Sequence, residues 1–160
     1  MKIILIRHGM TEGNLKRRYI GTTDEDLINT DCLKGDYPKC ERVVASPLKR
    51  CIQTAEYIYP NVDIEICDKL KECDFGDFEN KSYEDLKDNP DYQKWIDSNG
   101  ELPFPNGETH EDFKNRCKDG FFESLTERDT AFVIHGGSIM AIMQKLFGGN
   151  FYDYQVKNGC

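Results

Sequence analysis

The stretch Ile3-Ile4-Leu5-Ile6-Arg7-His8-Gly9 decides the fold, because an apolar run of strand length ends abruptly in an arginine, a histidine and a glycine. The same order returns late in the chain, where Ala131-Phe132-Val133-Ile134 is followed by His135-Gly136-Gly137. Short continuous apolar runs are typical of strands buried on both faces of a parallel sheet. Both histidines are therefore predicted at the carboxyl ends of strands, which is the edge where open α/β sheets bind ligands.

If the two strands are neighbours, the imidazoles of His8 and His135 meet over one small site. A neutral imidazole can attack phosphorus, while Arg7 and backbone N–H groups beside glycine can hold the anion. A lone histidine at a strand end is more often an ordinary polar residue than a nucleophile. The evidence for a site is that the order strand, histidine, glycine occurs twice. Together the two segments predict a phosphoryl-transfer site.

The rest of the chain alternates strand and helix patterns. Besides 2–6 and 131–134, strands are predicted at 42–45 and 62–66, and helices at 48–59, 83–97 with an interruption at Pro90, 111–125 and 138–147. This alternation predicts a three-layer α/β/α fold with a mostly parallel central sheet. Segments 26–41 and 99–108 are predicted to be irregular. The second is expected to form part of a pocket wall, with candidate lining residues Trp95, Phe104 and Tyr92.

Length and charge restrict the class of partner. A chain of 160 residues is expected to form a single domain, 1–160. The net charge of −8 argues against nucleic acid and anionic membranes as partners and favours a small phosphorylated substrate. An acidic protein that binds phosphate must concentrate positive charge locally, which gives weight to Arg7 and Arg50, with Arg17 or Arg18 as further candidates. The pattern leaves the oligomeric state open.

Cysteine and histidine spacing gives no sign of a metal site or a disulfide framework. The seven cysteines are odd in number and form no CxxC pair, and the three histidines lie far apart in sequence. The first apolar run is too short for a signal peptide, and no stretch of 18 apolar residues occurs. We therefore expect a reduced, cytoplasmic protein that uses neither a metal nor another cofactor.

Two further residues are predicted at the same edge of the sheet. Arg50 lies in the first turn of the helix that follows the strand at 42–45, and a helix N-terminus favours bound phosphate. Glu72 follows the strand at 62–66. A carboxylic acid near anionic phosphate keeps its proton more readily and can protonate a leaving alkoxide.

The complete set of motifs resembles the histidine phosphatase superfamily of phosphoglycerate mutase-like folds. The matching segments are Arg7-His8-Gly9 with Asn14, Ser46-Pro47-Leu48…Arg50…Gln53-Thr54-Ala55, Leu70…Glu72…Phe75-Gly76, Gly107-Glu108-Thr109…Arg116 and His135-Gly136-Gly137. The resemblance covers residues 1 to about 150. Within the superfamily, the segments 70–77 and 105–109 and the small size look most like the alpha-ribazole phosphatases of cobalamin synthesis.

The resemblance implies a role for each matched residue. His8 would be the nucleophile that becomes phosphohistidine, Arg7 and Arg50 would hold the phosphoryl oxygens, and His135 would donate to an equatorial oxygen. Glu72 would protonate the leaving group and then activate water. Residues expected to complete the substrate site are Asn14, Gly136, Gly21, Thr22 and Glu108, the last of which can also pair with Arg116.

Alternatives remain open at this stage. Arg50 and Glu72 can form a plain salt bridge, and His135 can cap a helix. A mutase is disfavoured because 77–97 holds only three lysines among many acids, and a binding module without activity is expected to have lost a reacting group.

The chain also departs from the family in three places. The segment 27–43 is short, so one sheet face is expected to be thinly covered. The chain stops at 158–160, where relatives continue into a last strand, and is expected to be short there. Asn80 replaces a glycine after Phe-Gly-x-x-Glu, a change that asparagine tolerates because it accepts left-handed backbone geometry.

Overall fold

The computed structural model describes residues 1–160 and contains a four-stranded parallel sheet. The strands are β1 (Ile3–Arg7), β2 (Arg42–Ala45), β3 (Ile64–Ile66) and β4 (Thr130–Ile134). Their order is β1-β4-β2-β3, so the first and last strands in sequence are neighbours. Arg7 pairs with Ile134 at the end of this register, which places both strand–histidine–glycine segments side by side.

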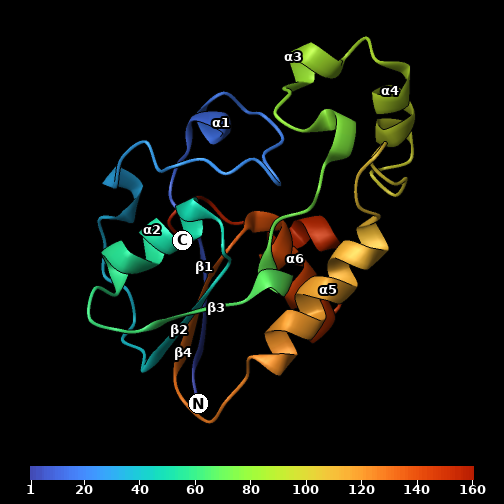
Figure 1. Ribbon diagram of the computed structural model, residues 1–160. Coiled ribbons are helices and arrows are strands. Elements are labelled where there is room, and N and C mark those ends of the chain that lie inside the picture. The colour runs from blue at the N-terminus through green and yellow to red at the C-terminus, as the bar shows by residue number, and fades with distance from the viewer.

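Helices cover both faces of the sheet, as predicted for an α/β/α fold (Figure 1). Helix α2 (Lys49–Ile58) packs on one face, and α5 (His110–Glu123) and α6 (Gly136–Phe147) pack on the other. The short helix α1 (Glu12–Leu15) and helices α3 (Tyr83–Leu86) and α4 (Pro90–Asp97) lie beyond the carboxyl ends of the strands. On the face that α2 covers, Tyr37 and Cys40 from the short segment 27–43 complete the cover.

The predicted elements are present, with shifted boundaries. The expected helix at 83–97 is two helices, because Asn89 caps the N-terminus of α4 with Pro90 at its first position. Helix α6 begins two residues earlier than expected, directly after His135. Segment 26–41 is irregular apart from a 3₁₀ turn at Asp31–Leu33 and an isolated bridge between Leu27 and Thr11. Asn80 has the expected left-handed geometry with a φ of 58°.

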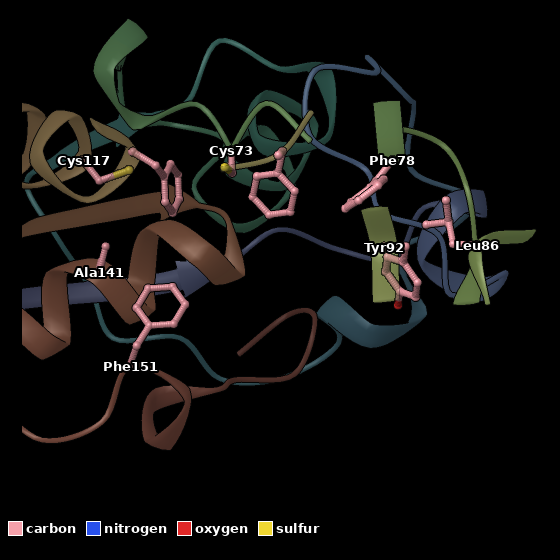
Figure 2. Close-up of a cluster of buried hydrophobic side chains, with 9 residues drawn as sticks. Cys73, Phe78, Leu86, Tyr92, Cys117, Ala141 and Phe151 are labelled. Atoms are coloured by element: carbon pink, nitrogen blue, oxygen red, sulfur yellow. The ribbon is translucent and has the colours of Figure 1, made fainter. Parts of the chain in front are cut away.

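The sheet and the distal helices are joined by one hydrophobic cluster. Figure 2 shows Cys117, Ala141 and Phe151 near α5 and α6, Cys73 in the middle, and Phe78, Leu86 and Tyr92 at the α3–α4 side. Phe78 and Leu86 are almost fully buried, at 0% and 1% exposure. Burial of this cluster fixes α3 and α4 above the strand ends, where they help to enclose the space beside the histidines.

The C-terminal residues lie against the end of β1. The backbone N–H of Arg7 donates to the Cys160 carbonyl at 2.6 Å, and Gly159 N–H donates to the Arg7 carbonyl at 3.0 Å. The Asn158 side chain donates to the carbonyl of His8 at 3.1 Å. The end of the chain therefore positions the segment that carries His8. Among the helices, none has the length and apolar character needed to cross a membrane.

Candidate active site

The two histidines meet at the ends of β1 and β4. Their ring centroids are 5.2 Å apart with the rings at 66°, and both side chains are buried, at 3% exposure for His8 and 0% for His135. Nδ1 of His8 contacts the Gly9 carbonyl at 2.7 Å. Because a carbonyl only accepts, Nδ1 must carry the proton and Nε2 keeps its lone pair. Burial, reinforced by Arg50 and Arg7, lowers the pKa of His8 to about 3, so the ring is neutral at ordinary pH.

Two arginines contribute unpaired donors to the same place. Arg50 is fully buried in the first turn of α2, and its terminal nitrogens donate to the carbonyls of Thr23 at 2.7 Å and Gly21 at 2.9 Å. Arg7 donates to the Val156 carbonyl at 2.8 Å. The Nε groups of both arginines are buried without a protein partner. Buried donors need acceptors, and a phosphoryl oxygen suits two guanidinium N–H groups.

Glu72 approaches the histidines from the segment after β3. Its carboxylate accepts the N–H of Cys73 at 2.9 Å and the N–H of Gly137, in the first turn of α6, at 3.2 Å. Burial raises the pKa of Glu72, although these two N–H groups and the arginines oppose the shift. A carboxyl with a raised pKa can hold a proton for transfer at higher pH than an exposed glutamate.

Two of the predicted binding residues, Asn14 and Gly136, have polar groups that other protein atoms leave free for a ligand. The Asn14 carbonyl oxygen is engaged by Thr11 N–H at 3.3 Å and by Asn158 at 3.1 Å, which leaves the amide nitrogen for a ligand. Gly136 is the first residue of α6, so its N–H has no partner within that helix. It also packs tightly on Arg7, because a Cβ at Gly136 would lie 3.3 Å from Arg7 Nε.

Gly21, Thr22 and Glu108 line a separate polar cavity of ≈ 540 Å³ that Glu72 also lines. Glu108 pairs with Arg116 at 2.8 Å and accepts the N–H of Asp74 at 3.3 Å. Arg116 in turn donates to the Glu72 carbonyl at 3.3 Å. The Glu108–Arg116 pair therefore shapes the segment that carries Glu72.

The structure shows neither a salt bridge between Arg50 and Glu72 nor a helix cap from the His135 side chain. Arg50 donates to backbone carbonyls and Glu72 accepts backbone N–H groups, so the two form no salt bridge. His135 occupies the N-cap position of α6, but its side chain makes no capping hydrogen bond. The further candidate Arg18 contacts exposed Asn80 at 3.3 Å, and Arg17 is exposed. These two arginines belong to the surface and not to the site.

Sequence reasoning missed several residues that hold the reacting groups. Ser46 contacts Nε2 of His135 at 2.7 Å, and Thr54 accepts the N–H of Gly9 at 2.9 Å. Glu79 accepts the backbone N–H groups of Gly21 at 2.8 Å and Thr23 at 2.9 Å, and so holds the loop that supports Arg50. One signal was available for Ser46, since it follows β2 as His8 and His135 follow their strands. Glu79 is the last residue of the Phe-Gly-x-x-Glu segment.

An apolar cavity of ≈ 370 Å³ opens beside the reacting groups. Arg7, Glu72 and Gly136 line one part of it, and aromatic rings line much of the rest. Trp95 and Phe104 are among these rings, as predicted, whereas Tyr92 is packed behind them at 3% exposure and does not line the cavity. The predicted wall from 99–108 is present through Gly100 and Phe104.

Comparison with known proteins agrees with this geometry. The model of the histidine phosphatase superfamily (branch 1) matches residues 3–160. The chain is 32% identical to the uncharacterized phosphatase PhoE of Bacillus subtilis (strain 168), covering 92% of this chain and 78% of that protein. It is 26% identical to the adenosylcobalamin/alpha-ribazole phosphatase of Salmonella typhimurium (strain LT2), covering 100% of this chain and 88% of the relative.

A solved structure shares the fold. The crystal structure of phosphoglycerate mutase from Thermus thermophilus superposes with a TM-score of 0.78 at 28% identity, covering 99% of this chain and 90% of that one. These similarities include both phosphatases and a mutase.

Proposed function

The chain belongs to the histidine phosphatase superfamily, and on that premise we propose that it is a metal-independent phosphomonoesterase that works through a phosphohistidine at His8. The observation that carries the proposal is the neutral, buried His8 with Nε2 free, set beside two buried arginine Nε groups that have no protein acceptor. A phosphomonoester supplies both the electrophile and the missing acceptors.

In the first step, Nε2 of His8 attacks phosphorus while the bond to the leaving oxygen breaks. Arg7 and Arg50 hold the equatorial oxygens, with further donors from His135, Asn14 and the Gly136 N–H. Glu72 gives its proton to the leaving oxygen, and the alcohol departs. Donors fixed in advance around developing charge supply the largest part of such catalysis.

In the second step, Glu72 is a carboxylate and accepts a proton from water as the water oxygen attacks the phosphorus of phosphohistidine. The P–N bond breaks, inorganic phosphate leaves, and Glu72 regains its proton. The same donors serve both displacements, because both occur at one phosphorus atom. Guanidinium, imidazole and backbone N–H groups supply the charge that a metal supplies in other phosphatases.

The lysines of the distal segment support a phosphatase over a mutase. A mutase must hold a second phosphate, yet Lys87 pairs with Glu84 at 2.8 Å and Lys94 with Asp91 at 3.0 Å. Lys81 donates to the Asp77 carbonyl at 2.7 Å. A binding module without activity is disfavoured because His8, Glu72 and His135 are all present.

For the physiological substrate, we propose a small phosphorylated metabolite and name alpha-ribazole 5′-phosphate, an intermediate of cobalamin biosynthesis, as the specific candidate. Its support is the likeness of segments 70–77 and 105–109 to alpha-ribazole phosphatases and the relative from Salmonella typhimurium. The seven free cysteines support a reducing compartment, and we propose the cytoplasm.

The test is a phosphate-release screen in buffer containing EDTA, across sugar phosphates, nucleotides, phosphoglycerates, phosphoserine, alpha-ribazole 5′-phosphate and para-nitrophenyl phosphate. We expect turnover of monoesters without added metal and without dependence on a bisphosphate. Restoration of lost activity by Mg²⁺ or Zn²⁺ after chelation would contradict the metal-free mechanism.

A further inference from the structure

The apolar cavity beside Glu72 is lined largely by aromatic side chains. It is lined by 17 residues, of which 10 are hydrophobic. Seven aromatic residues contribute to its wall: Tyr19, Phe75, Trp95, Phe104, Phe113, Phe151 and Tyr152. Several of these rings hold one another edge to face, as Tyr19 and Phe75 do at 5.4 Å and Phe75 and Phe104 at 5.1 Å. A wall fixed in this way is organised before a ligand enters.

The charge around the cavity excludes an anionic group at its far end. Arg7 and Glu72 lie at the reacting end, and the other ionisable side chains in the wall are His110, Cys73, Tyr19 and Tyr152. Burial and the nearby Lys114 lower the pKa of His110, so this ring is neutral at pH 7. Lys114 itself lies over Phe151 and does not line the cavity. A carboxylate or a second phosphate bound here would lose its hydration shell without gaining a cationic partner, and this desolvation opposes binding.

Besides Nε of Arg7 at the reacting end, a second polar group in the wall lacks a partner. Nε1 of Trp95 is buried and makes no hydrogen bond. The indole stacks on Tyr92 at 6.0 Å and packs on Phe104 at 5.2 Å, so the ring is fixed in place. Cζ2 and Cε2 of the indole face Gly100, because a Cβ added there would lie 3.2 Å from Cζ2, 3.6 Å from Cε2 and 2.8 Å from the Tyr152 hydroxyl. Buried N–H groups without acceptors are rare in folded proteins and call for a missing partner.

We propose that this cavity binds the alcohol part of the substrate, that this part carries a flat, uncharged heteroaromatic ring, and that Trp95 donates a hydrogen bond from Nε1 to an acceptor on that ring. The proposal rests on the proposed function, because it takes Glu72, which lines the cavity, as the group that protonates the leaving oxygen. It makes Trp95 a specificity-determining residue. Phosphoserine and phosphoglycerate, which carry a carboxylate, are disfavoured substrates.

Matched substrates isolate the single hydrogen bond. Benzyl phosphate and the three pyridylmethyl phosphates differ by one ring nitrogen and its position. For the wild type, we expect one pyridyl isomer to exceed benzyl phosphate in kcat/KM, and all four to exceed phosphoserine. Trp95→Phe keeps a ring but removes the donor, so it should reduce the preference for that isomer, measured as its kcat/KM divided by that of benzyl phosphate, about 3- to 10-fold.

Tyr92→Phe is the control variant. It removes the hydroxyl contact to Tyr19 at 2.8 Å within the same aromatic cluster, without replacing a residue that lines the cavity. We expect it to keep the isomer preference. Trp95 is the single tryptophan of the chain, so quenching of its fluorescence by benzylphosphonate and by the pyridylmethylphosphonates measures cavity binding independently of turnover.

The outcomes separate this inference from the proposed function. Turnover of para-nitrophenyl phosphate with no isomer preference, or a preference that survives Trp95→Phe, overturns the inference and leaves the phosphatase intact. Isomer-selective quenching without hydrolysis supports the cavity and contradicts the phosphatase. Neither quenching nor hydrolysis contradicts both.

Discussion

The ends of β1 and β4 carry the same residues in the same order, yet the two imidazoles are held by opposite nitrogens. His8 is held through Nδ1 by the Gly9 carbonyl, and His135 through Nε2 by the Ser46 hydroxyl. A carbonyl can only accept, so Nε2 of His8 keeps a lone pair. A hydroxyl can donate, so His135 can keep its proton on Nδ1. In the proposed mechanism, the hydrogen-bond partner of each ring, and not the repeated motif, assigns attack to His8 and donation to His135.

Replacing each histidine in turn is the strongest way to break this comparison. We expect His8→Asn to reduce kcat by a factor on the order of 10⁴ or more, because the nucleophile is gone. His135→Asn should reduce kcat about 10²- to 10³-fold, the usual loss for one donor to developing charge. Rapid quench with labelled substrate, compared at equal folded protein, should detect acid-labile phosphohistidine in His135→Asn and none in His8→Asn. Label retained in His8→Asn would reverse the roles.

The next test asks whether Glu72 or His135 protonates the leaving group. Glu72→Gln keeps size and hydrogen bonding but cannot supply a proton, so turnover of alkyl phosphates should fall about 10²- to 10⁴-fold. Para-nitrophenyl phosphate should suffer much less, because its phenolate leaves without a proton, and phosphohistidine should then accumulate. His135→Asn should affect both substrate types equally. The opposite pattern would make His135 the acid, and equal losses in Glu72→Gln would direct attention to Asp74 or Asp77.

Much of the sheet and of the candidate site can be predicted from the sequence, for physical reasons. Strand β4 is buried at every position and β1 is partly buried, and both are apolar at nearly every position, so the two runs stand out in the sequence. Arg50 and Glu72 follow predicted strands and match family motifs. The contacts of Asn158 with His8 and of Glu79 with Gly21 join residues 150 and 58 positions apart, and no local pattern encodes such pairings. The deep burial of His8 likewise depends on packing of segments remote in sequence.

A smaller expected effect is a loss of folding stability at acidic pH, which follows from the burial of His8. The unfolded chain takes up a proton near the ordinary histidine pKa of 6.5, whereas folded His8 resists until about pH 3. Stability should therefore fall as pH drops through 6.5, by about 1.4 kcal/mol per pH unit from this residue. His8→Asn removes this dependence, so urea unfolding at about pH 7 and about pH 5 should show a shallower loss than in wild type. Equal slopes would mean that His8 titrates normally.

The smallest expected effect tests the hydroxyl that distinguishes the two rings. Ser46→Ala removes the hydrogen bond to Nε2 of His135, so the imidazole is free to move its proton from Nδ1 and to rotate. We expect kcat to fall about 3- to 10-fold, as for loss of one net hydrogen bond. Ser138→Ala is the matched control, because that serine is equally buried but contacts the Leu70 carbonyl at 3.4 Å. A structural role alone would lower stability in both variants and leave the pH profile of kcat unchanged. A positioning role predicts a shifted pH profile in Ser46→Ala only, since the neutral form of His135 is then less well defined.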